Sequence, residues 1–153
     1  MNAANTAPMW GLPDPELKPE FYTDVVTKRF IAWFVDSVLI LLLCLIIIPF
    51  TAFTALFFLP FLYLVVGFAY RTISLANRSA TPGMRLMAIE FRSHDGTRLT
   101  LPLAALHTLG FTVATSVVFL QVISIVLMLT TARGQGLSDL VLGTAAVNRA
   151  AGQ

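Results

Sequence analysis

The chain has 153 residues, of which 57% are hydrophobic and only 12% are charged. Water-soluble domains carry about twice that charged fraction, so the composition excludes an ordinary globular surface and favours a membrane protein. The net charge is +2, but the ten basic residues are clustered along the chain. A single cysteine, Cys44, excludes an internal disulfide and is expected to be a small buried side chain in a membrane helix.

Residues 1–24 are polar and rich in proline and acidic residues, the reverse of a basic and then apolar signal peptide. We therefore expect no cleavable signal here, but a flexible or loosely docked N-terminal tail. Thr23 or Asp24 is expected to cap the helix that follows. Residues 25–150 are expected to form a single transmembrane domain.

Two apolar runs follow the tail, at about residues 30–48 and 52–70. The nineteen residues of the first run would span about 28 Å as a helix, close to the hydrocarbon thickness of a bilayer. Pro49 is expected to end the first helix and Pro60 to kink the second. A turn of about three residues joins the runs, which predicts an antiparallel hairpin.

Residues 71–100 differ from the two apolar runs, because they are polar and carry five arginines. The alternation around Asp95 and Gly96 predicts a short β-hairpin on the surface. Arginines close to a membrane surface attract anionic lipid headgroups by about 1 kcal/mol each. The candidates for such lipid contacts are Arg71, Arg78 and Arg85.

A third apolar stretch covers about residues 103–131, which as one helix overshoots the bilayer. It is either a long tilted span with a wet end near His107, a helix broken at Gly110, or a re-entrant pair of half-helices. We therefore predict an all-α membrane protein, a small helical bundle of about three transmembrane segments with a short cytoplasmic β-hairpin or loop.

Basic residues precede the first run and follow the second, but none lies in the turn between them. The positive-inside rule then places the N-terminus and residues 71–100 in the cytoplasm, in a cell (inner) membrane. A single third span would send the C-terminus outside, whereas Arg133 and Arg149 weakly prefer the inside. A re-entrant third stretch would reconcile these two indications.

Asp36 is the most informative residue, because a carboxylate within an apolar run costs at least a few kcal/mol unless it is paired, hydrated or protonated. Arg29 lies nearly two helical turns earlier on the same face, too far for direct contact, so we expect the two to share a third partner. Asp36 is then either an ion or proton site or a structural polar lock between helices. Asp139, by itself, is better explained as a helix cap or a solvated interfacial acid.

These residues occur in an order that resembles the RDD family of membrane proteins, which is named for an arginine and two aspartates. Here they are Arg29 and Asp36 in RFIAWFVD and Asp139 in GLSDLVLGTAAV. The patch TPGMRLMAIEFRSHDGTRL is similar to the family's Thr-x-Gly-Lys-Arg segment. Met84 stands in place of the usual lysine, and His107 where the family often has arginine.

The resemblance implies a membrane-embedded domain with a transport role, and cation/proton exchange for some members. It would make Asp36 and Asp139 carriers of a proton or a monovalent cation, with Arg29 as their charge partner. Three short spans enclose no path, so transport would require a homo-oligomer. The alternative is an accessory or scaffold subunit of a larger membrane complex, in which the same three residues form a buried polar network.

Other activities are not expected from this sequence. It contains no phosphate-binding loop and no catalytic nucleophile with its base, so we expect neither an enzyme nor a bound cofactor. His94 and His107, thirteen residues apart and without nearby cysteines, make a poor metal site. A membrane-anchored chain is also a poor candidate for binding nucleic acid.

Overall fold

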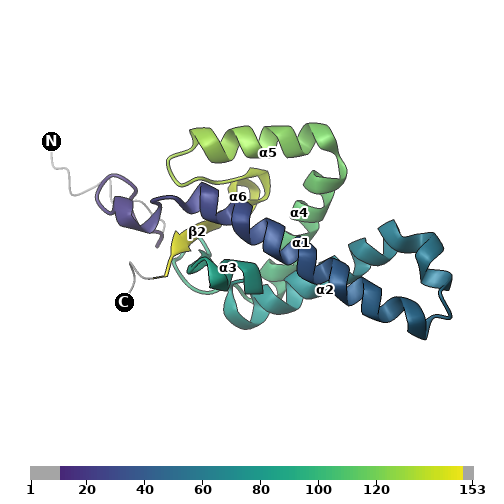
Figure 1. Ribbon diagram of the computed structural model, residues 1–153. Coiled ribbons are helices and arrows are strands. Elements are labelled where there is room, and N and C mark those ends of the chain that lie inside the picture. Colours follow the sequence, from purple (N-terminus) through teal and green to yellow (C-terminus); the bar gives the residue numbers. More distant parts are fainter. Residues whose placement is uncertain (1–10, 150–153) are drawn as a thin grey trace, which may run out of the picture.

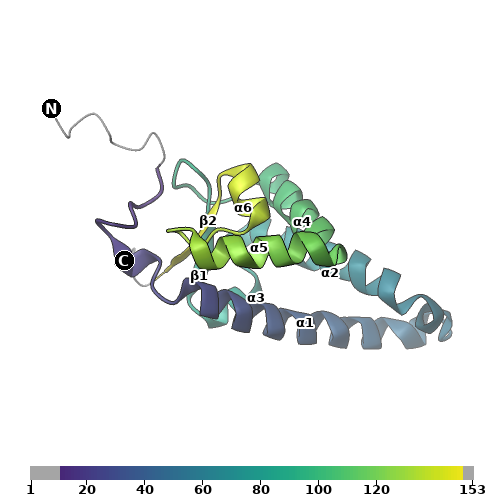
Figure 2. The ribbon, with the colours of Figure 1, turned by 90° about the horizontal axis from the view of Figure 1, so that it is seen from above.

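The computed structural model describes residues 11–149, which are mostly helical (Figures 1 and 2). In chain order the elements are the 3-10 helix η2 (Pro19–Phe21), α1 (Val25–Phe50), the 3-10 helix η3 (Thr54–Phe58), α2 (Leu59–Arg78), α3 (Pro82–Leu86), β1 (Ile89–Arg92), α4 (Leu101–Ser116), α5 (Val118–Thr130), α6 (Leu137–Leu142) and β2 (Ala145–Asn148).

The two predicted apolar runs form a long helical hairpin. Within the described residues, the segments Pro19–Phe50 and Thr54–Arg78 are long and apolar enough to cross a bilayer. Pro49 lies inside the last turn of α1, so the helix does not end at this proline as expected but one residue later, at Phe50. The predicted kink at Pro60 is wrong, because Pro60 lies in the first turn of α2, where its missing N–H costs nothing. The segment before it is the separate helix η3.

The third apolar stretch is a bent pair of helices. The axes of α4 and α5 turn by 115° at Val117, whose backbone is extended. The break therefore does not lie at Gly110, which belongs to the interior of α4. Gly110 instead lets α6 approach, since a Cβ atom at this position would lie 3.0 Å from the Cβ of Ser138.

The predicted β-hairpin is only half correct. The strand β1 and the turn at Gly96 are present, with φ of +81° at that glycine. However, β1 pairs antiparallel with β2, near the C-terminus, with Ile89 opposite Asn148 and Arg92 opposite Ala145. β2 is buried along its whole length and consists mostly of small side chains without alternation, so the sequence pattern does not mark it as a strand.

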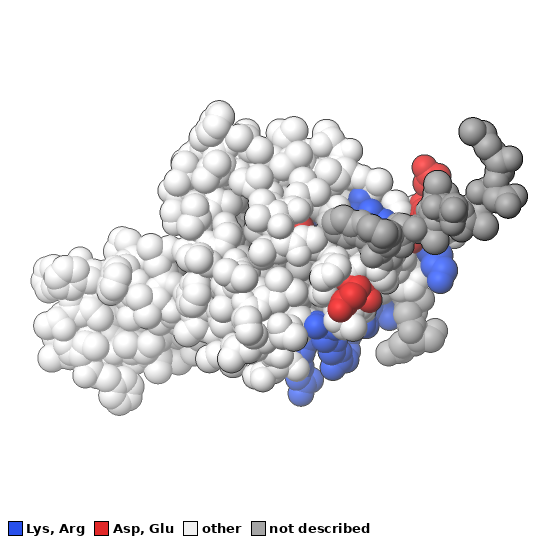
Figure 3. Space-filling view, turned by 180° about the vertical axis from the view of Figure 1, so that it is seen from behind, with Lys and Arg blue, Asp and Glu red and all other residues white. Residues whose placement is uncertain are grey.

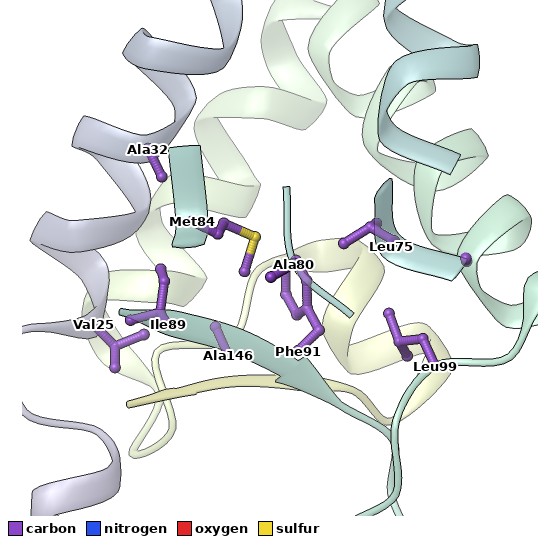
Figure 4. Packing of buried hydrophobic residues seen from close by; sticks show 10 residues of the cluster. Val25, Ala32, Leu75, Ala80, Met84, Ile89, Phe91, Leu99 and Ala146 are labelled. Atoms are coloured by element: carbon purple, nitrogen blue, oxygen red, sulfur yellow. The ribbon is translucent and has the colours of Figure 1, made fainter. Parts of the chain in front are cut away.

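The core lies at one end of the helices, between the small sheet and α1, α2 and α3 (Figure 4). Its buried residues are Val25, Ala32, Leu75, Ala80, Met84, Ile89, Phe91, Leu99, Ala104 and Ala146. Away from this core the helices expose large apolar side chains, such as Phe50 and Phe57 at 86% and 84%. Lysines and arginines gather at the core end, and the other end is bare of charge (Figure 3). This distribution suits helices that leave a polar surface and enter lipid.

The start of α1 and the two strands meet at this polar end. Lys28 Nζ donates to Asn148 Oδ1 over 2.7 Å, and Asn148 Nδ2 donates to the carbonyls of Glu20 and Thr23. The tail expected at residues 1–24 falls partly outside the described residues, but Gly11 N donates to His94 O over 2.6 Å. Since β1 precedes the α4–α5 pair and β2 follows it, this pair begins and ends at the same end of the molecule.

This arrangement makes a prediction for labelling in membranes. In a Cys44→Ala background, single cysteines at Arg98 and Arg149 should react with a membrane-impermeant maleimide from the same side. A cysteine at Thr54, the first residue of η3 between α1 and α2, should react only from the opposite side. Opposite-side labelling at Arg98 and Arg149 would contradict the paired strands, because a β-ladder cannot form across a bilayer.

Candidate functional site

Asp36 lies on α1 in a buried position, with 2% of its surface exposed. Among residues 11–149 its carboxylate accepts three hydrogen bonds, from Tyr70 Oη at 2.7 Å, Thr81 Oγ1 at 2.5 Å and Gly83 N at 2.8 Å. These donors come from α2 and from the start of α3. Buried polar groups are costly unless they are hydrogen-bonded, so these three donors compensate for much of the hydration that the Asp36 carboxyl group loses.

The Thr81-Pro82-Gly83 segment is shaped around this carboxylate. Thr81 is the N-cap of α3 and accepts a hydrogen bond from Met84 N while it donates to Asp36. At Gly83 a Cβ atom would lie 2.3 Å from the carbonyl oxygen of Ala32 and 2.9 Å from Asp36 Cγ. Only glycine therefore allows α3 to approach α1 closely enough for its backbone N–H to reach Asp36.

Asp139 lies at the third position of α6 and is fully buried. In the described part of the chain its carboxylate has four partners: Arg29 Nη1 at 2.6 Å, His107 Nε2 at 2.7 Å, Gly136 N at 2.9 Å and Thr144 Oγ1 at 3.1 Å. The bond from Gly136 N caps the helix, as expected for this acid, but the predicted alternative of a solvated acid is wrong. Asp139 joins α1, α4 and α6.

The environment of Asp139 favours its ionised form. Burial alone would raise the pKa of this carboxyl group, but the Arg29 guanidinium and the His107 hydrogen bond outweigh burial and hold the pKa below its usual range. Arg29 also donates to the carbonyl of Gly134 over 3.0 Å, and its guanidinium lies 5.2 Å from the centre of the Phe91 ring. The pair is therefore fixed from several directions.

His107 is a fully buried hydrogen-bonding residue on α4, so the wet end expected near it is absent. Its Nε2 faces Asp139, so in a neutral ring Nε2 carries the proton, and the Phe91 ring centre lies 4.4 Å from that of His107. Within residues 11–149, no three His, Cys, Asp or Glu side chains lie close enough together to hold a metal ion.

Arg29 and Asp36 do not share a hydrogen-bonding partner in the described structure, so this expectation is wrong. The two face different neighbours, because α3 approaches α1 at Asp36 whereas α6 approaches it at Arg29. Arg71 lies within electrostatic range of both clusters, and interacts most strongly with Asp36.

The three arginines predicted to contact lipid headgroups differ in exposure. Arg78 and Arg85 are exposed, whereas Arg71 is 8% exposed. Arg71 lines a cavity of about 120 Å³ between α1, α2 and α4, together with Asp36. Nothing in the sequence distinguishes Arg71 from the exposed arginines near it. The partners of Asp36 on α2 and α3 could not be predicted either, because the sequence does not show which segments contact α1. The N-cap role of Thr81, which accepts from Met84 N, does have a sequence signal, because a threonine directly before a proline is typical of a helix start.

The contact at Gly83 can be tested by adding a methyl group. Gly83→Ala should lower the melting temperature in detergent by several degrees, because the new Cβ would force α3 away from Asp36. Gly67→Ala is the matched control, since its Cβ would meet Ile40 Cδ1 at an ordinary 3.6 Å. Equal effects of the two substitutions would show that the close approach at Gly83 is unimportant.

The ion pair can be tested by neutralising its acid. Asp139→Asn should lower the free energy of unfolding by about 3 kcal/mol, because it leaves Arg29 partly buried without its counter-charge. Since the folded pKa of Asp139 is depressed, this contribution is complete above pH ~4 and is lost only as the pH falls further. Asp24→Asn, at an exposed acid, is the control and should have little effect. Equal melting of both variants at pH 7 would refute the pair's role.

Comparison with known proteins agrees with this geometry. The sequence model of the RDD family matches residues 24–143, which include Arg29, Asp36 and Asp139. No curated protein and no solved structure matches the chain. The match covers most of the chain and the apolar helices suit a bilayer. This chain therefore belongs to the RDD family and is a membrane protein.

Proposed function

We propose that this protein transports a small ion or solute across the membrane, and that Asp36 takes up and releases a proton during transport. The observation that carries this proposal is the position of Asp36 in the wall of a cavity among apolar helices. Ionisable residues within a membrane are costly, and they often mark proton or ion pathways. Cation/proton exchange is the version that family resemblance favours.

The partners of the two aspartates support Asp36 rather than Asp139 as the carrier. Tyr70 and Thr81 hold Asp36 by hydroxyl groups, which can donate to a carboxylate or accept from a protonated acid. Asp139 is held by a guanidinium, which only donates. Protonation of Asp36 can therefore keep its hydrogen bonds, whereas protonation of Asp139 would break an ion pair.

The transport proposal includes a membrane placement. We place the polar end in the cytoplasm, by the positive-inside rule, with α1 and α2 as two crossings. The α4–α5 pair is then re-entrant, since it starts and ends at the polar end, and Arg133 and Arg149 also lie on the cytoplasmic side. Two crossings and a re-entrant pair enclose no path alone, so transport needs a homo-oligomer or another subunit.

The role of Asp36 can be measured in liposomes that contain the purified protein and a pH-sensitive dye. Under an imposed pH gradient, sodium or potassium outside should dissipate the gradient with the unaltered protein. Asp36→Asn should abolish this response while the protein still elutes as one species. Ser37→Ala, which alters the same cavity without removing a charge, should retain most of the rate.

Two results would refute specific parts of the proposal. If neither sodium nor potassium dissipates the pH gradient in liposomes with the unaltered protein, the proposal of cation/proton exchange is wrong. If Asp36→Asn exchanges at the original rate, Asp36 is not the carrier.

The second candidate is an accessory or scaffold subunit of a larger membrane complex. It is favoured by the complete internal pairing of Asp139 and by the three internal donors to Asp36 in the described structure, as in a structural lock. In this case Asp36→Asn should reduce yield and thermal stability, and the unaltered protein should show no transport. Recovery of this chain alone from a mild detergent extract would count against a subunit.

A further inference from the structure

Arg71 is a buried cation that lacks a hydrogen-bonding partner among residues 11–149. It lies on α2 with 8% of its surface exposed, and it makes no hydrogen bond within the part of the chain that the structure describes. Its guanidinium carbon lies 3.8 Å from the centre of the Phe111 ring. A guanidinium has five N–H donors, and a ring face and a distant carboxylate satisfy none of them by hydrogen bonding.

Asp36 does not supply the missing acceptor. Its carboxylate faces Tyr70, Thr81 and Gly83, and its attraction for Arg71 acts without direct contact. Unmatched buried donors are expensive, by about 1–3 kcal/mol or more for a charged group. The donors of Arg71 are therefore available to a ligand that supplies acceptor oxygens.

The cavity next to Arg71 has room for such a ligand. Its volume is about 120 Å³, and its wall is largely apolar apart from a few hydroxyl groups and the charges of Arg71 and Asp36. Trp33 and Leu64 lie in its wall and are themselves 42% and 45% exposed. Both belong to helices that suit a bilayer, so part of the cavity wall reaches the surface that would face lipid.

A buried cation in the wall of a mostly apolar cavity suits an amphiphile with one anionic headgroup. The head would accept hydrogen bonds from the fork of Arg71, and an apolar chain would lie along the exposed helix surface. Arg71 also lies two turns from the end of α2, toward the polar end of the molecule, so the leaflet at that end supplies the headgroup.

We propose that the cavity between α1, α2 and α4 binds an anionic lipid of the bilayer, with its phosphate or carboxylate on Arg71. The site differs from surface contacts at the exposed Arg78 and Arg85, because its cation is enclosed by three helices. The proposal concerns binding alone, so it stands or falls separately from transport.

Trp33 provides a probe in the cavity wall. The chain has two tryptophans, so Trp10→Phe leaves Trp33 as the sole reporter. The purified protein is placed in micelles containing lipid with brominated chains, which quench tryptophan fluorescence on contact. Brominated phosphatidic acid should quench Trp33 at roughly tenfold lower concentration than brominated phosphatidylcholine, the shift expected for one strong charge-assisted contact.

Substitutions of two arginines test whether the preference for the anionic headgroup depends on Arg71. Arg71→Gln should remove the headgroup preference, Arg71→Lys should retain part of it, and Arg85→Gln, at an exposed arginine, should leave it unchanged. If the Arg71 variants do not fold, the comparison of the two brominated lipids with the protein that retains Arg71 still tests the proposal. Equal quenching by both lipids, or an unchanged preference in Arg71→Gln, would overturn the proposal. If millimolar inorganic phosphate displaces the lipid, the cavity binds a free anion and the proposal of a lipid ligand is wrong.

Discussion

The ion pair between Arg29 and Asp139 is the constraint on which the rest of the structure depends. Two charges in an apolar bundle each cost several kcal/mol unless they meet with good geometry and further hydrogen bonds, and here they do. The pair holds α6 against the start of α1, so the chain after α4 must return to where it began. The sharp turn between α4 and α5 and the pairing of β2 with β1 are consistent with this single requirement.

The family is named for an arginine and two aspartates, but the two acids have different environments. Asp139 faces a fixed cation and Asp36 faces neutral donors. The ion pair holds Asp139 as an anion, whereas the transport proposal assigns proton uptake to Asp36 because its partners are neutral. This contrast depends on which helix approaches α1 at each level, and α3 can reach Asp36 only because residue 83 is glycine.

Features governed by local chemistry were predictable from the sequence. The helical hairpin, the glycine turn at Gly96 and the burial of Asp36 follow from run length, turn preference and the cost of a charge in an apolar run. The partner of β1 and the pairing of Arg29 with Asp139 were not predictable, because both join residues far apart in sequence. A short run of small residues such as β2 carries no periodic signal, and Arg71 differs from exposed arginines only through its surroundings.

The position of Arg71 couples the two proposed properties of the protein. Two arginines and two aspartates lie within electrostatic range there, so their formal charges cancel. Protonation of Asp36 would remove the anion that most strongly attracts Arg71 and leave that cation uncompensated. An anionic headgroup on Arg71 would restore the balance, so, if both proposals hold, proton uptake and lipid binding favour each other by the same factor. If both proposals hold, a membrane rich in anionic lipid favours the protonated form of Asp36.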